Sequence, residues 1–172
     1  MPRPERRGKP TPQKRPPEST TPQPLICARW MTTRLHTVKP LDSVAHARAL
    51  MEEHRINHLP VVRNGVLVGI ITDRDLRDAV ESVITSAKLA HAAEPVPGTS
   101  EKIPVETVMT HNVITLAPHS TMVNAAAVMR RERLGCVPIV DGGFLVGIVT
   151  RNDVLDAFIA REDATQTAPT AR

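Results

Sequence analysis

Two stretches of the chain show the same pattern of apolar and polar positions. Residues 31–80 align with residues 109–158 at a constant offset of 78, without a gap, and 19 of the 50 paired positions are identical. The apolar run Leu67-Val68-Gly69-Ile70 recurs as Leu145-Val146-Gly147-Ile148. Self-similarity at a fixed period indicates a repeated structural unit, so the pattern predicts two tandem copies of one fold element.

Each copy is predicted to open with a short strand followed by a helix. The strands are expected over 35–38 and 113–116, each shortly before a proline. Asp42 and Ser120 then lie where the N-cap of a helix belongs. The apolar residues that follow have the three- and four-residue spacing of one helical face. They are Val44, Ala47, Leu50 and Met51 in the first copy, and Met122, Ala125, Ala126 and Met129 in the second.

Each copy is predicted to continue with a β-hairpin and a second helix. In the first copy, Asn64-Gly65 separates two β-rich runs, and this pair is a strong tight-turn signal because both residues tolerate positive φ. The second copy has Asp141-Gly142-Gly143 at that place. The last helix is expected to begin at Thr72 or Thr150. The four strands are predicted at 58–62 and 66–71, and at 139–140 and 144–149.

These elements predict an α/β fold of the α+β kind, with two β-α-β-β-α repeats packed with pseudo-two-fold symmetry. One such unit has too little core to be stable alone. Two units are therefore expected to pack face to face, share a core, and leave clefts where their sheets meet. The predicted organisation is a disordered Pro-rich basic tail over 1–24, a first repeat over 25–80, a linker over 81–104 that is helical to about Ala93, a second repeat over 105–160, and a flexible C-terminus over 161–172.

The positive charge of the chain is concentrated in its tail. The formal net charge is +4, and residues 1–24 carry six basic and two acidic side chains, so residues 25–172 are balanced. The tail is interpreted as a solubilising leader, with a weak anchor for acidic partners as the alternative. Nucleic-acid binding by the folded part is not expected, because its surface is not basic and the chain has only Trp30, Phe144 and Phe158 for stacking on bases.

Composition also argues against a membrane protein, a metal site and an enzyme. Cys27 and Cys136 form neither a CxxC motif nor a metal-ligand spacing, and a reducing, cytoplasmic location is expected. No apolar run approaches the ~20 residues that span a bilayer. The histidines are interpreted as scattered surface residues, and no Ser-His-Asp or Cys-His arrangement has support. We therefore expect no metal, no catalytic residue and no catalytic cofactor.

The junction Gly-x-x-Thr-x-x-Asp, which occurs once in each copy, is the motif that could bind a ligand. A threonine at a helix N-cap places backbone N–H groups and the positive end of the helix dipole at a potential phosphate site. An aspartate three residues later can accept hydrogen bonds from a sugar diol, and a neighbouring arginine can pair with phosphate. The glycine would let a backbone or a flat ring approach closely. The same spacing is nearly a capping box, so a purely structural role remains open. The residues are Thr72, Arg74 and Asp75, and Thr150, Arg151 and Asp153.

Taken together, the repeat, the His-Leu-Pro-Val-Val and Cys-Val-Pro-Ile-Val strands at 58–62 and 136–140, and the two junctions resemble a tandem CBS-domain pair, also called a Bateman module. The resemblance covers about residues 25–160. Within that family, the stretches 55–60 and 73–78 are similar to the CBS pair of acetoin-utilisation AcuB-type proteins.

This resemblance implies a ligand and a set of contacts. The implied ligand is an adenosine nucleotide such as AMP, ADP or ATP, with the threonine near the phosphate and the aspartate on the ribose. Ile70 and Ile148 would face the ring. The opposite repeat would supply the rest of each adenine pocket, at His36, Thr37, Ile56, His58, Ile114, Thr115 and Cys136. A homodimer and an unidentified regulated protein partner are also implied.

Two main functions remain open at this stage, beside the lesser alternative that the basic tail binds nucleic acid. The first is a regulatory, energy-sensing module whose conformation responds to nucleotide in clefts between the repeats. The second is a structural dimerisation or interaction module with vestigial sites.

Overall fold

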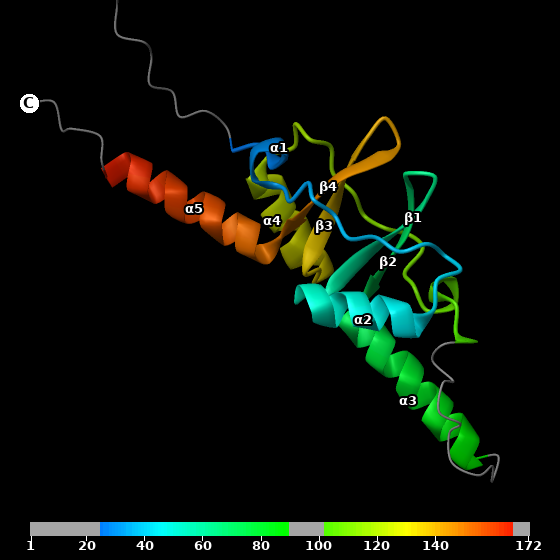
Figure 1. Ribbon diagram of the computed structural model, residues 1–172. Coiled ribbons are helices and arrows are strands. Elements are labelled where there is room, and N and C mark those ends of the chain that lie inside the picture. Colours follow the sequence, from blue (N-terminus) through cyan, green and yellow to red (C-terminus); the bar gives the residue numbers. More distant parts are fainter. Residues whose placement is uncertain (1–24, 90–101, 167–172) are drawn as a thin grey trace, which may run out of the picture.

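The structure is a computed structural model that describes residues 25–89 and 102–166 (Figure 1). The predicted disordered tail, the end of the predicted linker helix near Ala93 and residues 167–172 lie outside these ranges. The helices and strands follow the repeat, with a short helix and a 3-10 turn preceding the two copies. In chain order they are α1 (Cys27–Trp30), α2 (Val44–His54), β1 (His58–Arg63), β2 (Val66–Thr72), α3 (Asp73–Leu89), a 3-10 turn (Val105–Thr107), α4 (Met122–Glu132), β3 (Cys136–Asp141), β4 (Phe144–Thr150) and α5 (Arg151–Gln166).

Both hairpins form where the turn residues predict them. Strands β1 and β2 pair antiparallel, and so do β3 and β4, each pair with one irregularity at the equivalent place. Asn64 and Gly65 have φ of 53° and 81°, and Gly142 and Gly143 have φ of 55° and 89°. These are left-handed conformations, which glycine and asparagine adopt at low cost, and they match the twist of the strands that they connect.

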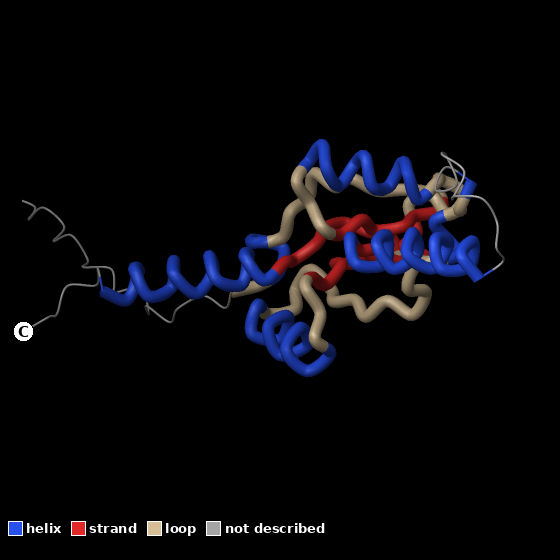
Figure 2. The backbone as a smooth tube through the Cα atoms, turned by 90° about the horizontal axis from the view of Figure 1, so that it is seen from below, coloured by secondary structure: helices blue, strands red, loops and turns tan. Residues whose placement is uncertain are grey.

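The two hairpins meet at their turn ends in one four-stranded sheet of order β1-β2-β4-β3. The pairing between β2 and β4 is limited to Val66 and Phe144, and the N–H of Leu145 donates to the carbonyl of Gly65 at 3.1 Å. Helices lie on both sides of the strands (Figure 2), and α3 and α5 extend in opposite directions away from them (Figure 1). The mixed helix and sheet architecture with two equivalent halves confirms the predicted fold class.

The buried apolar residues form two clusters, one for each repeat. Each cluster is completed by the segment at the start of the other repeat. Val105 and Met109, at the start of the second repeat, belong to the first cluster, whereas Cys27, at the start of the first repeat, belongs to the second. The expectation of a single core shared face to face was therefore wrong. The repeats are joined by two exchanged segments, residues 25–32 and 103–110. Each lies at the start of one repeat and packs on the core of the other.

Backbone hydrogen bonds fix this exchange. The N–H of Val44 donates to Ile103 at 2.9 Å, and the N–H of Cys27 donates to Ser120 at 2.7 Å. Antiparallel bridges join Ile70 to Thr110 and Thr32 to Ile148 at equivalent places. Each exchanged segment is therefore held by the main chain as well as by its buried side chains.

The glycines of the two junctions accommodate methionines of the exchanged segments. A Cβ atom on Gly69 would lie 2.4 Å from Sδ of Met109, and a Cβ atom on Gly147 would lie 2.4 Å from Sδ of Met31. Distances of this size exclude any side chain unless the methionine moves. These glycines thus permit packing between the repeats, rather than the approach of a ligand ring that the sequence suggested.

Helices α2 and α4 begin one residue later than predicted. Their N-caps are Ser43 and Thr121, whose side-chain oxygens each accept a hydrogen bond from a backbone N–H three residues on. Asp42 instead accepts from the N–H of Lys39 at 2.7 Å, and Ser120 accepts from the N–H of Ala117. The predicted caps therefore stabilise the turn that leads into each helix.

The strands predicted over 35–38 and 113–116 are reduced to isolated bridges. Val38 pairs with Val61, and Leu116 pairs with Ile139, both in parallel. The residues just before these bridges line a cleft instead of extending the sheet, as described below. At the other end of the molecule, α5 continues to Gln166, past the predicted boundary at residue 160. No helix within the described ranges has both the length and the apolar character needed to cross a membrane.

Candidate functional site: two clefts between the repeats

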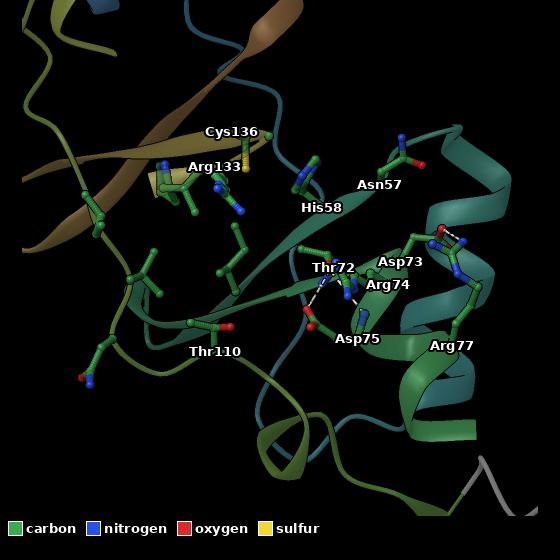
Figure 3. A pocket seen from close by; sticks show the side chains of 17 residues that line it. Asn57, His58, Thr72, Asp73, Arg74, Asp75, Arg77, Thr110, Arg133 and Cys136 are labelled. Carbon is green, nitrogen blue, oxygen red and sulfur yellow. Dashed lines mark hydrogen bonds and ion pairs between the residues drawn. The ribbon is translucent and has the colours of Figure 1, made fainter. Parts of the chain in front are cut away.

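Cleft 1 is a cavity of about 440 Å³ between the β2–α3 junction and two segments of the second repeat. Figure 3 shows Thr72 and Asp75 on one side, Cys136 and Arg133 on the other, and His58 between them. The junction contributes Ile70, Thr72, Asp73, Arg74, Asp75 and Arg77. The opposite repeat contributes Thr110, Asn112, Val113 and Ile114, together with Arg133, Leu134, Gly135, Cys136 and Pro138.

Cleft 2 is the pseudo-symmetric counterpart, with a volume of about 420 Å³. Here the junction belongs to the second repeat and the opposite wall to the first. The junction contributes Ile148, Thr150, Arg151 and Asn152. The opposite wall consists of Thr32, Arg34, Leu35 and His36, together with Arg55, Ile56, Asn57, His58 and Pro60.

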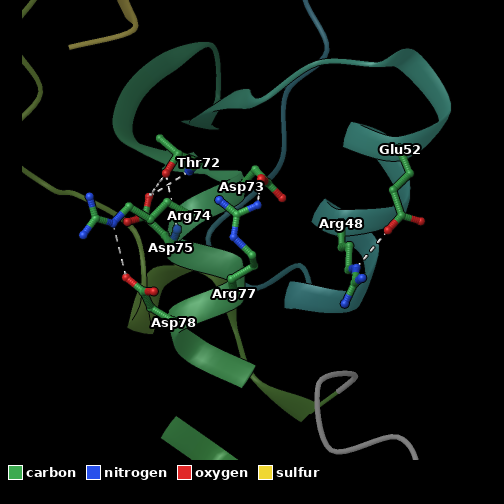
Figure 4. Close-up of polar contacts among 8 residues, drawn as sticks. All are labelled: Arg48, Glu52, Thr72, Asp73, Arg74, Asp75, Arg77 and Asp78. Carbon is green, nitrogen blue, oxygen red and sulfur yellow. Dashed lines mark hydrogen bonds and ion pairs between the residues drawn. The ribbon is translucent and has the colours of Figure 1, made fainter. Parts of the chain in front are cut away.

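The two Thr-x-x-Asp junctions have the geometry of a cap in both copies. Oδ2 of Asp75 accepts from the N–H of Thr72 at 2.8 Å and from its hydroxyl at 2.7 Å (Figure 4). Oδ2 of Asp153 accepts from Thr150 in the same way, at 2.6 and 2.7 Å. Each threonine hydroxyl lies 3.3–3.4 Å from the aspartate N–H. The capping role that the sequence left open is therefore present in each repeat.

This cap leaves the second carboxylate oxygen available. All hydrogen bonds that the structure shows for the two carboxylates use Oδ2. Both aspartates are partly exposed, and Asp75 lines cleft 1. Capping and ligand contact are thus compatible at Asp75, because one oxygen can hold the helix start while Oδ1 accepts from a ligand.

The arginines of the first junction are held by carboxylates on the same helix. Arg77 pairs with Asp73, and Nε of Arg74 lies 3.7 Å from Asp78 (Figure 4). In the second junction, Nε of Arg151 donates to the backbone carbonyl of Leu134 at 3.0 Å. This hydrogen bond holds the guanidinium stem of Arg151 against the segment between α4 and β3 of the same repeat.

His58 belongs to both clefts. Its ring lies against Gly135, where a Cβ atom would be 2.6 Å from Nε2, so the glycine makes room for the imidazole. Burial lowers the pKa of His58 most strongly, the positive charge of Arg151 lowers it further, and the carboxylate of Asp75 raises it. The neutral imidazole is therefore favoured in the common wall of the two clefts.

Cys136 is the repeat-equivalent of His58 and lines cleft 1. Burial raises the pKa of its thiol to about 12. The thiol therefore stays protonated near neutral pH, and it lacks the thiolate character of a nucleophile. Cys136 acts here as a small apolar wall.

Most of the sequence-predicted site residues lie in a cleft. Ile70, Thr72, Arg74, Asp75, Ile114 and Cys136 line cleft 1; His36, Ile56, Ile148, Thr150 and Arg151 line cleft 2; and His58 lines both. Thr37, Thr115 and Asp153 line neither. Thr37 and Thr115 come directly after His36 and Ile114, the last residues of these segments to line the clefts. Thr37 borders a separate depression near Lys39 and Asp42.

Several lining residues were not predicted from the sequence. Arg55 and Arg133 are the C-cap residues of α2 and α4, with φ of 54° and 57°, and each lines one cleft. A left-handed arginine is uncommon, because glycine and asparagine are the residues that favour this position. The signal was present in the sequence, since these arginines are identical in the two copies.

The fold and the paired clefts define a module of two interlocked repeats, with one potential ligand site at each crossing between a helix start and the opposite repeat. The CBS domain family model matches residues 27–82 and 105–160. The chain therefore belongs to the CBS domain family and contains a tandem pair of these domains, as the sequence motifs predicted.

Individual relatives agree with this assignment. The CBS domain-containing protein YhcV of Bacillus subtilis is 32% identical over 134 residues, which cover 78% of this chain and 86% of that protein. The structure of a proposed acetoin utilization protein (AcuB) from Vibrio cholerae matches with a TM-score of 0.68 and 29% identity, covering 84% of this chain and 98% of the other. CBSX2 of Arabidopsis thaliana, solved in complex with AMP, matches with a TM-score of 0.65 and 27% identity over 80% of this chain and 98% of the other.

Proposed function

We propose that this chain is a regulatory module that binds adenosine nucleotides in its two clefts and has no catalytic role. The observation that carries the proposal is the duplicated site. Each cleft combines a threonine-capped helix start, an isoleucine and arginines within a cavity of about 440 or 420 Å³. Cavities of roughly 300–1,000 Å³ with a few convergent polar groups are typical of small-molecule sites. The AMP complex of CBSX2 supports adenosine as the ligand class.

In this proposal the phosphates and the base have partners in both clefts, and the ribose has one in cleft 1. The helix N-terminus and the arginines bind phosphate, because backbone N–H groups and the helix dipole favour an anion there. Ile70 and Ile148 provide apolar surface for the adenine. In cleft 1, Oδ1 of Asp75 accepts from the ribose hydroxyls while Oδ2 keeps its cap on Thr72.

The arrangement also supports regulation. Each cleft has one wall from each repeat, so a bound nucleotide contacts both. A ligand shifts a conformational equilibrium only if it binds one state more tightly than the other. A site that spans the boundary meets that condition when a change in the angle between the repeats separates its walls.

Titration calorimetry and thermal shift with AMP, ADP, ATP, NAD and S-adenosylmethionine test the proposal. We expect saturable binding of at least one adenosine nucleotide, with an increase in melting temperature at excess ligand. GTP serves as the control for the base. If none of the adenosine compounds binds at millimolar concentration, the proposed function is wrong and the module is structural.

The alternative, a dimerisation or interaction module, is favoured by one surface. Leu155, Phe158 and Ile159 are 58%, 61% and 55% exposed on α5, and their spacing places them on one helical face. We propose that this face contacts a second copy of the chain. Phe158→Glu is expected to shift sedimentation from dimer to monomer at micromolar concentration, and Arg161→Glu on the same helix is the comparison. A wild-type monomer at that concentration would contradict the proposal.

A further inference from the structure

The two clefts are lined largely by repeat-equivalent residues, so the positions at which they differ indicate how their ligands differ. The threonines of the exchanged segments and the arginines at the helix C-caps are the same in both. Two differences add positive charge to cleft 2. Cleft 2 has Arg34 where cleft 1 has Asn112, and it has Arg151 where cleft 1 has Asp73.

The positive charge of cleft 1 is largely compensated. Two carboxylates, Asp73 and Asp75, line the cleft itself. Arg77 already pairs with Asp73, and Arg74 lies within 4 Å of Asp78. Arg133 is left as the arginine of this cleft without a carboxylate partner among the described residues.

The positive charge of cleft 2 is not compensated. Arg34, Arg55 and Arg151 line it, and no carboxylate does so within the described ranges. None of the three takes part in an ion pair with a described residue. Two differences run in the other direction: Asn152 stands in place of Arg74, and Leu155, the equivalent of Arg77, does not line cleft 2. Both change little, because Arg74 and Arg77 already lie beside Asp78 and Asp73 in cleft 1.

We infer that cleft 2 selects the nucleotide with the longer phosphate chain, such as ATP, whereas cleft 1 selects a nucleotide of lower charge, such as AMP. The inference rests on the proposed function and adds the discrimination between the two sites. Arginine is suited to phosphate because its planar fork donates two hydrogen bonds at once. Each exposed ion pair changes an affinity by about two- to fivefold. The two additional unpaired arginines of cleft 2 should therefore raise its preference for ATP over AMP by about tenfold.

Isoleucine methyl resonances can report the two clefts separately in the full chain. Ile70 and Ile114 line cleft 1, and Ile56 and Ile148 line cleft 2. AMP and ATP are titrated without Mg²⁺, which would neutralise part of the phosphate charge, and the dissociation constants are read from each pair of methyl groups. The preference for ATP over AMP is expected to be about tenfold greater at cleft 2 than at cleft 1.

The reciprocal variants R34N and N112R each give one cleft the residue that the other cleft has at the equivalent position. Both positions are exposed and lie outside helices and strands, so the fold is expected to persist, as circular dichroism can verify. R34N should reduce the ATP preference of cleft 2 by about two- to fivefold, and N112R should raise that of cleft 1 by a similar factor. The preference at cleft 2 should also weaken more steeply as salt is added, because exposed charges are screened.

The outcomes separate this inference from the proposed function. If no methyl resonance responds to AMP or ATP, both are wrong. If the clefts bind both nucleotides with equal preference and neither variant changes it, the discrimination is overturned while nucleotide binding stands. A stronger ATP preference at cleft 1 would overturn it in the same way.

Discussion

Replacing Asp75 or Asp153 by alanine tests whether one side chain can cap a helix and also bind a ligand. The two carboxylates make the same hydrogen bonds to Thr72 and Thr150, at distances that differ by no more than 0.2 Å. They differ in their surroundings, because Asp75 lines cleft 1 and Asp153 lines neither cleft. The pair therefore separates a structural role from a ligand-binding role within one molecule.

The expected loss of stability is similar for the two variants. Loss of a cap costs about 0.5–2 kcal/mol, and a hydrogen bond to a charged group contributes about 1.5–3 kcal/mol. Because both sites are partly exposed, we expect each substitution to lower the free energy of unfolding by about 1–2 kcal/mol. Asp78→Ala is the control, since an exposed ion pair of this kind contributes about 0–1 kcal/mol.

The expected effects on binding differ. Asp75→Ala should weaken AMP binding at cleft 1 by about tenfold, the equivalent of ~1.4 kcal/mol, whereas Asp153→Ala should leave the affinity of cleft 2 unchanged. Urea denaturation gives the stability and calorimetric titration gives the affinity, below the temperature at which either variant unfolds. A normal AMP affinity in Asp75→Ala would refute the dual role of Asp75. Loss of binding in Asp153→Ala would show that its carboxylate reaches the ligand after all.

Three further results are expected. His58 has a lowered pKa in the folded state, so its contribution to stability is complete above its usual pKa of 6.5 and is lost as the pH falls through the folded value; urea denaturation at pH 7.5 and 5.5 should show a larger loss for wild type than for His58→Gln, and an equal loss would exclude His58 as the cause. Burial raises the pKa of both Cys27 and Cys136, so a disulfide exchange reagent at pH 8 should modify neither thiol until denaturant is added; rapid labelling of the native protein would contradict this packing. Gly69→Ala should lower the free energy of unfolding by about 1–3 kcal/mol, because its Cβ would meet Met109 at 2.4 Å; Gly142→Asn should cost less, because the position has open space and its equivalent in the first hairpin, Asn64, already adopts a positive φ.

Local signals in the sequence were sufficient for the elements of each repeat. Asn64-Gly65 located the first hairpin turn, and its positive φ values follow from the steric freedom of those residues. The apolar spacing of α2 and α4 identified the faces that are buried, including Met51 and Met129. The N-caps were misplaced by one residue, because Asp42 and Ser43 are both good capping residues and only the backbone geometry decides between them.

Non-local features could not be read from the sequence. The docking of residues 25–32 on the second repeat depends on tertiary packing. Local secondary-structure propensities do not determine which repeat a segment packs against. The close contact between Met31 and Gly147 shows the consequence. The sequence interpretation allowed a backbone or a flat ring to approach this glycine, whereas the side chain of Met31 occupies the space. Arg34 was missed because the sequence placed this part of the cleft wall at His36 and Thr37, whereas the wall begins earlier in the segment.

The exchanged segments link the clefts to the interlock between the repeats. Met31 packs on Gly147 and Thr32 pairs with Ile148, and Arg34 follows directly in the wall of cleft 2. In the same way, Met109 packs on Gly69 immediately before the residues that line cleft 1. A ligand in either cleft would therefore contact the residues that directly follow the packing contacts between the two repeats. Because a packed contact of this kind has discrete arrangements rather than a continuous range, a small movement of the cleft wall can be transmitted as a change in how the repeats are docked.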